Sequence, residues 1–502
     1  MSNDPKNNKQ NGISVEDMYQ QRLKKIDALR AEGKNLYGQR VENLTAIKEI
    51  KEKFAELPED SEEKLTFTTA GRLMARRVMG KSAFANIKDQ KGNLQLYMQR
   101  DEIGRDNYMA FKALDIGDII SVTGYAFKTQ TGEISLRTLK YDLLSKAVRP
   151  MPEKFHGLTD TEQRYRQRYI DLISNDDVRR TFELRSKVIH EVRNFLNNRG
   201  FMEVETPMMQ TLAGGAAARP FKTHYNALDT TMYLRIAPEL FLKRLIVGGF
   251  EKVYEIGRNF RNEGMDRKHN PEFTAIELYE AYSDCRGMME LIEEMVTTIA
   301  EKTVGTLELK AANGNTVNLT RPWRVAPYQD LIKEKMGCDW YDLTPEQQRE
   351  KARAIDLRIP DEMDSLHITH EIYEKTIEDT LIQPTFVTRL PAFLVPLAKR
   401  CTDNPELVDV YELEINGQEI SPGYSELNDP EEQRSRFDTQ LVGNSEQDGE
   451  VDRIDEDFLT ALEYGMPPTG GLGMGIDRLI MLISGAESIR DVILFPQMRP
   501  QK

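Results

Sequence analysis

The stretch RNFRNEGMDRKHNPEF, residues 258–273, decides the fold because it joins two strand-like segments across a charged loop. Residues 251–256 lead into it, and residues 274–282 leave it with alternating apolar side chains, which predicts an antiparallel hairpin. The cations of the loop are Arg258, Arg261, Arg267, Lys268 and His269. Several cations on a rigid hairpin suit a polyphosphate, because guanidinium groups neutralise and orient phosphate oxygens. A solvated loop explains the same residues about equally well.

A glycine-rich segment, GLGMGIDRL at residues 471–479, lies near the other end of the chain. It leads into an apolar helix expected over residues 476–483, with Arg478 in the first turn. Glycines let a ligand approach the backbone, and a helix start favours anions. A tight turn between a strand and a helix is the plainer interpretation of the same pattern.

A third segment is acidic and forms an apparent hairpin that turns at Asn416-Gly417. Its carboxylates are Glu412, Glu414, Glu419 and Glu426. Glu412 and Glu414 are two residues apart and share one face of a strand, as carboxylates that hold Mg²⁺ beside a nucleotide would. A solvated strand face is the more common explanation of this spacing.

The familiar nucleotide and metal motifs are absent from the sequence. The tripeptide GKS at 80–82 ends like a phosphate loop, but Ala75 stands where the first glycine is required. Residues 470–475 do not fit the dinucleotide fingerprint. His367 and His370 are three apart without a third ligand, which favours a surface helix over a zinc site.

Short strand-like segments separated by turns precede these motifs. They cover residues 66–74, 83–88, 94–99, 119–126 and 133–139. With one helix-like stretch at 107–114, they predict a five-stranded OB-type barrel. Its basic residues near Phe84 and Tyr97 are Arg72, Arg76, Arg77, Lys81 and Lys88. Such a face suits phosphates and stacked bases, although a solvated basic surface is equally consistent with it.

We therefore expect an α+β protein in which a barrel precedes a larger mixed domain. The predicted parts are a flexible tail (1–13), a helical extension (14–64), the barrel (65–147), a polar linker (148–178) and a large domain (179–502). The large domain opens with a helix over 179–198, has strands near 202–205 and 233–236, and contains a helical insertion at about 346–381.

Composition restricts the class of protein. The 502 residues carry a net charge of −14, which argues against a wholly non-specific nucleic-acid binder but not against a local basic face. No apolar run is long enough to span a membrane, and the polar start lacks the apolar part of a secretory signal. Cys285, Cys338 and Cys401 show no CxxC spacing, so we expect a cytoplasmic protein without a disulfide framework.

The order of the segments resembles one family. RGFMEVETP at 199–207 is similar to motif 1 of class II aminoacyl-tRNA synthetases, residues 259–263 to motif 2, and residues 471–478 to motif 3. The barrel points to the group for aspartate, asparagine and lysine. Further stretches resemble bacterial lysyl-tRNA synthetases from about residue 15 to the end: YRQRYIDL (165–172), GGAAARPF (214–221), IAPEL (236–240), HNPEFT (269–274) and SELND (425–429).

The resemblance implies an OB-fold anticodon-binding domain before a class II catalytic domain that uses ATP, with Mg²⁺ as cofactor. Arg261 would contact the α-phosphate and Arg478 the γ-phosphate, as the catalytic pair. The remaining ATP contacts would come from His269 to the phosphates, and from Glu263 and Phe273 to the adenine. Glu412 and Glu419 would ligate Mg²⁺, with Glu414 outside that role.

The resemblance also implies a lysine pocket and a tRNA contact. Glu239 would bind the α-amine of lysine, Glu277, Tyr279 and Glu426 would surround its ε-ammonium, and Tyr424 would line its stem. In the barrel, Phe84, Gln95 and Glu133 would recognise the uridine-rich lysine anticodon. The implied activity is ATP-dependent formation of lysyl-adenylate and its transfer to the 3′-OH of tRNA(Lys). The implied assembly is a homodimer with motif 1 at its interface.

One departure from the family pattern concerns the pocket. The family has asparagine two residues before the pocket aromatic Tyr424, and this chain has Pro422 there. Because proline has neither a side-chain amide nor a backbone N–H, it removes a hydrogen bond expected for the substrate carboxylate. We expect altered lysine affinity, with the preference for the ε-ammonium retained by the acids.

Other functions are less consistent with these residues. A relative that lysylates a protein would lack the barrel, and one specific for aspartate or asparagine would not need Glu426 and Tyr279 around a cationic stem. A non-catalytic RNA-binding protein on the same fold would be favoured by loss of Arg261 or Arg478, and both are present. A metal-dependent hydrolase would require a ligand cluster that the sequence lacks.

Overall fold

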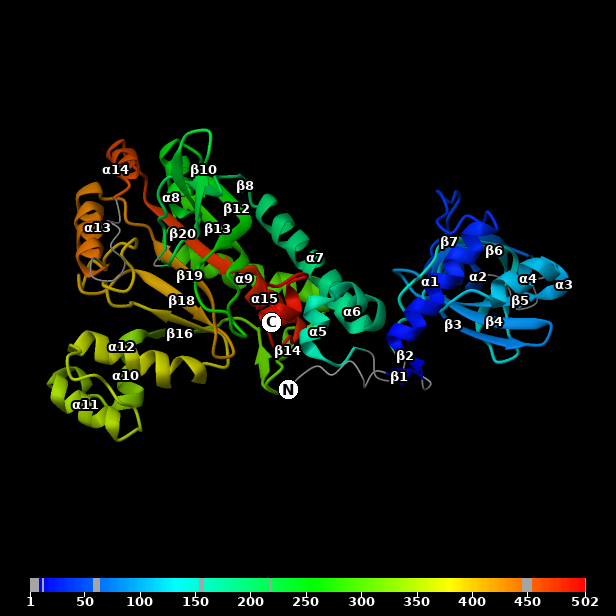
Figure 1. Cartoon of the computed structure of the whole chain (residues 1–502). Helices are drawn as coiled ribbons and strands as arrows, with labels where there is room; N and C mark the ends of the chain where they lie inside the picture. The colour runs from blue at the N-terminus through cyan, green and yellow to red at the C-terminus, as the bar shows by residue number, and fades with distance from the viewer. Residues whose placement is uncertain are drawn as a thin grey trace. The chain divides into compact units, whose positions relative to one another are not determined.

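The computed structural model describes residues 9–10, 13–56, 64–152, 158–216, 218–444 and 454–501. The chain forms two compact units, residues 1–159 and residues 160–502 (Figure 1). The first holds the predicted barrel and the second the three charged segments that the sequence singles out.

Unit 1 is built around a closed barrel in the strand order β3-β4-β5-β7-β6. The strands are β3 (Thr66–Met79), β4 (Ser82–Lys88), β5 (Asn93–Gln99), β6 (Ile119–Lys128) and β7 (Ile134–Ser145). Buried residues alternate with partly exposed ones along β4 and β5, as a barrel with a filled interior requires. The predicted five-stranded OB-type barrel is confirmed, with β3 and β7 longer than predicted.

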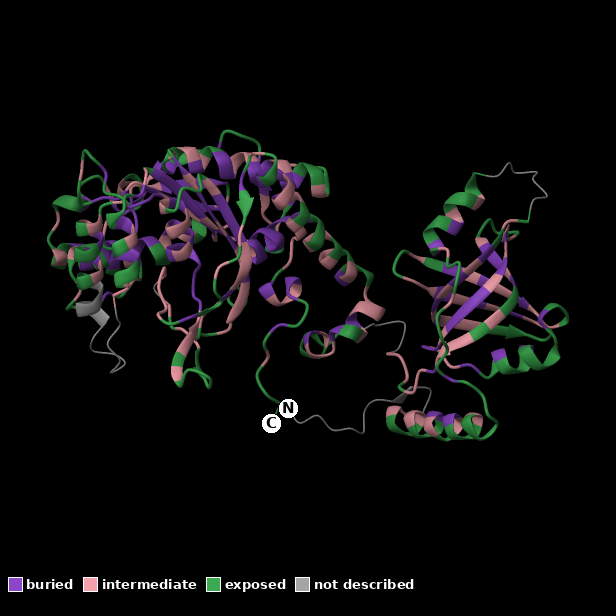
Figure 2. Ribbon diagram, turned by 90° about the horizontal axis from the view of Figure 1, so that it is seen from above, coloured by how far each residue is buried: buried purple, intermediate pink, exposed green. Residues whose placement is uncertain are grey.

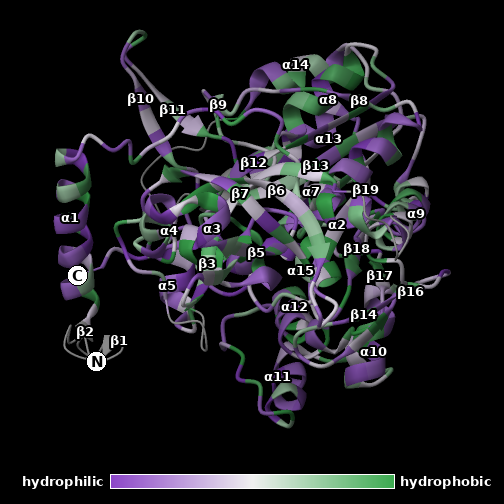
Figure 3. Ribbon diagram, turned by 90° about the vertical axis from the view of Figure 1, so that its right-hand side faces the viewer, coloured by the Kyte–Doolittle hydropathy of each residue, from purple (hydrophilic) through white to green (hydrophobic). Residues whose placement is uncertain are grey.

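Short helices accompany the barrel. The predicted helical stretch near 107–114 is α4 (Arg105–Lys112), directly preceded by α3 (Arg100–Ile103). Before the barrel, the helical extension consists of α1 (Val15–Ala31) and α2 (Ile47–Ala55). Ser14 caps α1 by accepting a hydrogen bond from the Asp17 N–H, and most of α1 is hydrophilic (Figure 3).

The start of the chain contains β1 (Lys9–Gln10) and β2 (Ile13–Ser14). These are two-residue strands that pair with each other. The other residues of the predicted tail 1–13 lie outside the described residues, as do 153–157 of the predicted linker and 445–453 of the acidic stretch.

The predicted polar linker 148–178 contains two helices that belong to unit 2, α5 (Thr161–Arg166) and α6 (Arg168–Ser174). Arg168 is fully buried, pairs with Asp171 at 2.6 Å and donates to the Leu494 carbonyl at 3.0 Å. The charges that suggest a solvated hinge therefore make buried contacts with the C-terminal segment, which the sequence pattern alone does not reveal.

Unit 2 is organised on an eight-stranded sheet in the order β16-β17-β18-β19-β20-β13-β12-β8. The strands are β8 (Met202–Glu203), β12 (Lys252–Phe260), β13 (Glu272–Ala281), β16 (Arg324–Pro327), β17 (Thr385–Thr388), β18 (Val410–Glu414), β19 (Glu419–Ser425) and β20 (Thr469–Gly475). Pairing is antiparallel except for β8 with β12 and β16 with β17. The 258–273 hairpin is confirmed, with Asn259 opposite Phe273.

Three helices pack on one side of this sheet and form its core. They are α7 (Asp176–Asn197), α9 (Cys285–Val304) and α15 (Ile476–Ser484). Their apolar faces meet the sheet in one cluster that includes Val192, Met295 and Ile480, all 0 % exposed. Figure 2 shows this buried layer along the strands of unit 2. The helices on this side leave the other face of the central strands for a ligand.

The other elements of unit 2 surround this core. A small sheet contains β9 (Met209–Gln210), β10 (Lys222–Tyr225) and β11 (Thr230–Leu234), and β14 (Glu308–Lys310) pairs with β15 (Thr316–Asn318). Helices α8 (Glu239–Val247), α13 (Pro430–Asn444), α14 (Glu456–Glu463) and α16 (Ile489–Val492) complete it.

The predicted helical insertion is present and begins earlier than residue 346. It contains α10 (Tyr328–Met336), η2 (Trp340–Asp342), α11 (Pro345–Arg353), α12 (Ser365–Thr376) and η3 (Glu378–Thr380). These helices have a hydrophobic core of their own around Trp340. None of the helices in the described part of the chain has the length and apolar character that crossing a membrane requires.

Candidate functional site

The central strands of unit 2 bring the predicted site residues to one face of the sheet. Glu277 lies opposite Gly473 and Tyr279 opposite Gly471, which in turn faces Tyr424. Because directly opposite residues project to the same face, these side chains share one surface. The same rule adds Phe273, two residues along from Ala275 and four before Glu277. The family-implied contacts to ATP and to lysine thus lie on one sheet surface.

Glycines in β20 provide the space for this surface. A Cβ added at Gly471 would lie 2.0 Å from Glu426 Oε1 and 2.6 Å from the Tyr279 ring. A Cβ added at Gly473 would meet Glu277 and Pro422 only at 3.7 and 4.0 Å. Gly471 is therefore required by the close approach of the pocket side chains, a reason the sequence pattern left open between ligand access and a tight turn.

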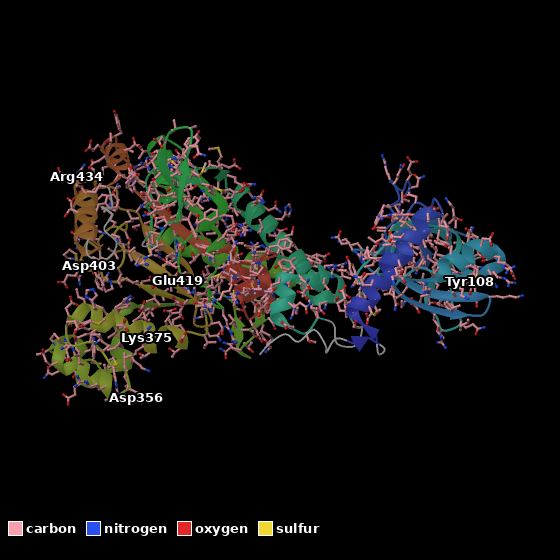
Figure 4. The ribbon with its side chains drawn as sticks, in the orientation of Figure 1. Tyr108, Asp356, Lys375, Asp403, Glu419 and Arg434 are labelled. Atoms are coloured by element: carbon pink, nitrogen blue, oxygen red, sulfur yellow. The ribbon has the colours of Figure 1, made fainter. Side chains whose placement is uncertain are left out.

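The phosphate-facing cations gather beside the acidic hairpin. Arg478 Nη1 donates to the Glu419 carbonyl at 2.7 Å, and its Nη2 lies 3.4 Å from His269 Nε2. His269 Nδ1 lies 2.8 Å from Asp266 Oδ2, which orients the ring. Glu419 begins β19, within the group of strands shown in Figure 4. Three segments far apart in the sequence therefore meet at one point, as a polyphosphate site requires.

Arg261 and Phe273 form the neighbouring part of the site. The Arg261 guanidinium lies 5.2 Å from the Phe273 ring centroid, in cation–π geometry. Its Nε is buried without a hydrogen-bond partner among the described residues. A buried, unsatisfied donor next to an exposed aromatic face suits an anionic ligand with a planar base. Glu263 is exposed on the same loop.

The acidic hairpin concentrates carboxylates that repel one another. Burial, followed by the charges of Glu419, Glu378 and Glu374, raises the pKa of Glu412 to about 8. The described residues contain no ready-made group of three or more ligands for a metal ion. Mg²⁺ commonly takes one or two carboxylates and completes its shell with phosphate oxygens and water, so Glu412 and Glu419 fit a nucleotide-bound ion.

Glu414 differs from its neighbours on the hairpin. Its side chain is 1 % exposed, and Oε2 has no hydrogen-bond partner among the described residues. Burial raises the pKa of Glu414 to about 10, so the carboxyl is protonated at neutral pH. A neutral carboxylic acid is a poor Mg²⁺ ligand, which agrees with its expected place outside the metal site.

The lysine pocket contains a cation that the sequence analysis missed. Lys243 is 0 % exposed, and its Nζ lies 2.7 Å from Glu239 Oε1 and 2.5 Å from Glu426 Oε2. Both carboxylates raise the pKa of Lys243, which stays protonated. The sequence did hold a signal: Glu239 and Lys243 are four apart in an otherwise apolar helix, so the pair had to be buried.

Glu277 is the pocket carboxylate without a cationic partner among the described residues. It accepts a hydrogen bond from the Tyr279 hydroxyl at 3.2 Å. Burial, followed by the charge of Glu239, raises the pKa of Glu277 to about 8. A carboxylate held out of bulk water without a counter-ion attracts a ligand cation, because ion pairing would release this penalty.

Pro422 lies in an interior strand, where it removes a backbone donor. It stands opposite Glu412 in β18, and the β19–β20 pairing begins at the next residue, Gly423. The Ser421 hydroxyl donates to the Gly473 carbonyl at 2.5 Å. This contact supplies a donor to β20 where proline offers none.

The predicted anticodon residues come together on the outer surface of the barrel. Phe84 packs against Tyr97 at a ring-centroid distance of 5.0 Å. Gln95 Nε2 donates to Glu133 Oε2 at 3.3 Å, and its Oε1 accepts from Ser135. Strands β4, β5 and β7 thus present an aromatic face beside a polar, hydrogen-bonding pair, the combination that reads unpaired bases.

Two of the expected basic residues have structural roles instead. Arg72 donates to the Gly117 carbonyl at 2.8 Å, and Arg76 donates to the carbonyls of Phe111 and Leu114. Both lie on β3 rather than in loops. Arg77 is opposite Phe84 and stays close to the aromatic face. A cation that satisfies buried carbonyls is indistinguishable from a phosphate ligand in the sequence alone.

Comparisons with known proteins match both units. Residues 160–499 match the family "tRNA synthetases class II (D, K and N)", and residues 67–144 match "OB-fold nucleic acid binding domain". The chain is 52% identical over 481 residues to a protein of Carboxydothermus hydrogenoformans named Lysine--tRNA ligase, which is 96% of this chain and 97% of that protein.

Two further proteins of the same name are similar. The one from Staphylococcus aureus is 53% identical over 431 residues, 86% of this chain and 87% of its own length. The one from Halalkalibacterium halodurans is 49% identical over 490 residues, 97% and 98%. Both matches, like the first, run through the barrel and the large unit.

Proposed function

This chain belongs to the class II tRNA synthetases for aspartate, lysine and asparagine, and we propose that it is the lysine–tRNA ligase of that group. It activates L-lysine with ATP to lysyl-adenylate and transfers the lysyl group to the 3′-terminal adenosine of tRNA(Lys) for protein synthesis. The observation that carries the assignment is the pocket: Glu239, Glu277 and Glu426 converge beside the phosphate-facing cations, and such an excess of acids selects a dicationic amino acid.

The activation step requires positioning rather than a protein nucleophile. A carboxylate oxygen of lysine attacks the α-phosphorus of ATP, and the bond from that phosphorus to the bridging oxygen breaks to release pyrophosphate. We assign Arg261 to the α-phosphate, where its unsatisfied Nε is available for the charge that develops. Arg478 and His269, which lie 3.4 Å apart, hold the γ-phosphate end.

The adenine and the metal occupy the flanks of the same surface. Phe273 stacks on the adenine ring, and Glu263 reads its edge from the motif 2 loop. Glu412 and Glu419 hold Mg²⁺, which when bound neutralises phosphate charge. Without a cation the carboxylates of this hairpin raise one another's pKa, which supports the assignment.

The amino-acid side is assigned to the opposite end of the surface. Glu239 binds the α-amine, Glu277, Tyr279 and Glu426 surround the ε-ammonium, and Tyr424 lines the aliphatic stem. The second step needs no further acid or base: the 3′-OH of the tRNA attacks the lysyl carbonyl, and AMP leaves with the bonding electrons.

The barrel supplies tRNA recognition in this account. Phe84 stacks on an anticodon base, while Gln95 and Glu133 hydrogen-bond base edges. The local aromatic and polar face accounts for RNA binding by a chain whose overall charge is −14.

We further propose a homodimer that works in the cytoplasm. The motif 1 segment includes β8 and leads to Met208 and Met209, and Met202, Met208 and Met209 are 41%, 46% and 54% exposed. Apolar side chains exposed next to one another favour a protein interface. Light scattering should give a mass near twice 57.8 kDa, and a mass near 57.8 kDa would contradict the dimer.

The experiment that tests the ligase assignment is aminoacylation with radiolabelled lysine, ATP and Mg²⁺. We expect charging of a tRNA(Lys) transcript and none of a tRNA(Asp) transcript, with label lost if the 3′-terminal hydroxyl is blocked. Charging of the aspartate transcript with aspartate, and not the lysine transcript with lysine, would transfer the chain to another member of its group.

A further inference from the structure

The buried Lys243 bridges two acids that the lysine pocket assigns to opposite ends of the substrate. Its Nζ lies 2.7 Å from Glu239 Oε1 and 2.5 Å from Glu426 Oε2. One oxygen of each carboxylate is therefore engaged by the protein, and the other remains for a ligand. Glu426 Oε1 is buried and has no hydrogen-bond partner among the described residues.

The free Glu426 oxygen points into the pocket. It lies where a Cβ on Gly471 would come within 2.0 Å, and the Tyr279 ring borders the same space at 2.6 Å. A ligand ammonium that reaches Tyr279 therefore also reaches Glu426 Oε1. Lys243 approaches Glu426 through the other oxygen, Oε2, so it leaves this position open.

Charge counting gives the bridge a further meaning. The pocket holds three carboxylates, Glu239, Glu277 and Glu426, and Lys243 neutralises one charge of that set. Two negative charges remain, and L-lysine brings two ammonium groups. An amino acid with a neutral side chain would leave one buried charge unpaired, which is strongly unfavourable.

We propose that Lys243 is a positioning residue that sets specificity for lysine: it holds Glu239 and Glu426 ionised and turned so that each offers its second oxygen to the substrate amines. This inference rests on the proposed function and deepens it. Lys243 itself stays out of reach of the substrate, since its own ammonium is enclosed by the two acids and it is 0 % exposed.

The other charged groups around the bridge do not replace it. Tyr279 and Tyr424 face the acids as neutral phenols, because burial raises the pKa of both hydroxyls well above the usual value. Arg235 is paired with Glu255, and Arg261 lies over Phe273. Burial raises the pKa of Glu426 and the Lys243 ammonium opposes that rise, so removing Lys243 favours a protonated Glu426.

The test compares Lys243→Met with a matched variant, Lys146→Met, in lysine-dependent ATP–pyrophosphate exchange without tRNA. Lys146 is also a buried lysine between two acids, Asp115 and Asp118, but it belongs to the barrel unit. For Lys243→Met we expect the lysine KM at pH 7 to rise about 100-fold, the size expected when a buried charge pair loses one partner. The ATP KM should change less than about 3-fold, and the lysine KM should fall as the pH rises from 7 to 9.

Lys146→Met should keep the lysine KM and its pH profile even where its thermal stability falls. A folded Lys243→Met enzyme with the wild-type lysine KM and pH profile would overturn the inference. If Lys243→Met does not fold, the double variant Lys243→Met/Glu426→Gln removes the unpaired charge. It should fold and keep a raised lysine KM with little pH dependence, whereas a wild-type KM in it would also overturn the inference.

The wild-type enzyme separates this result from a failure of the proposed function. If the wild-type protein shows no lysine-dependent exchange, the ligase assignment fails. If it shows exchange and Lys243→Met behaves like it, the ligase assignment stands and the role of Lys243 alone is rejected.

Discussion

Single buried charges determine the chemistry of the pocket. Glu277 has no cation partner among the described residues, and its pKa is raised to about 8 by burial and then by Glu239. At pH 7 this carboxyl is mostly protonated in the free enzyme, whereas pairing with the substrate ammonium requires the carboxylate. Binding of lysine must therefore release a proton.

We predict that lysine binding at pH 7 releases close to one proton, and that the release falls toward zero above about pH 9, beyond the pKa of Glu277. Calorimetry in two buffers of different ionisation enthalpy measures the number. Proton release that does not change between pH 7 and pH 9 would contradict a raised Glu277 pKa.

The same shift affects stability with the opposite dependence on substrate. An acid whose pKa is raised on folding weakens the folded state as the pH climbs from the unfolded value, near 4.5, to about 8. Glu277→Gln should therefore be more stable than the wild type at pH 9 but not at pH 4.5, while it loses lysine binding. Thermal unfolding at the two pH values checks the sign.

Pro422 is a residue-scale departure whose effect should fall on the substrate carboxylate. We expect the lysine KM of the wild type to be far above that of Pro422→Asn, because asparagine restores a side-chain donor that proline lacks. Exchange kinetics compare the two proteins. Ser421, whose hydroxyl serves Gly473, should be kept unchanged in this comparison. Equal KM values would sink the idea.

At the scale of elements, the packing of β20 under the pocket is the most specific feature. Gly471→Ala should lower stability by about 1–3 kcal/mol, the cost of an overpacked methyl group, because its Cβ would overlap Glu426 and Tyr279. Gly473→Ala, in the same strand, should cost little, since its nearest neighbours are 3.7 and 4.0 Å away. Urea unfolding of both proteins without substrates measures the difference, and equal losses would contradict this packing.

The sequence predicted elements well where one pattern dominates. The barrel strands and the 258–273 hairpin alternate clearly, so both are confirmed. The segment 148–178 was misread as a linker because its arginines look solvated, although Arg168 is buried against the C-terminal segment. Lys243 was missed for the same reason: burial of a charged residue depends on partners distant in the chain, which a local pattern does not contain.

At the scale of the whole molecule, the two units divide the work between tRNA recognition and chemistry. The barrel residues Phe84, Gln95 and Glu133 belong to unit 1, and every residue assigned to ATP or lysine belongs to unit 2. Activation of lysine without tRNA should therefore be independent of the barrel face.

We predict that Phe84→Ala raises the KM for tRNA(Lys) about 5- to 150-fold, the equivalent of one lost stacking contact of about 1–3 kcal/mol. Its lysine-dependent pyrophosphate exchange without tRNA should match the wild type, which serves as the internal control for folding. A wild-type tRNA KM in this variant would remove Phe84 from the tRNA contact.

The central claim is that the acidic pocket selects lysine for activation by ATP. Pyrophosphate exchange with Mg²⁺, measured for each of the twenty amino acids without tRNA, tests it most directly. We predict exchange with lysine alone. Exchange driven by another amino acid, or none from folded protein, would contradict the claim.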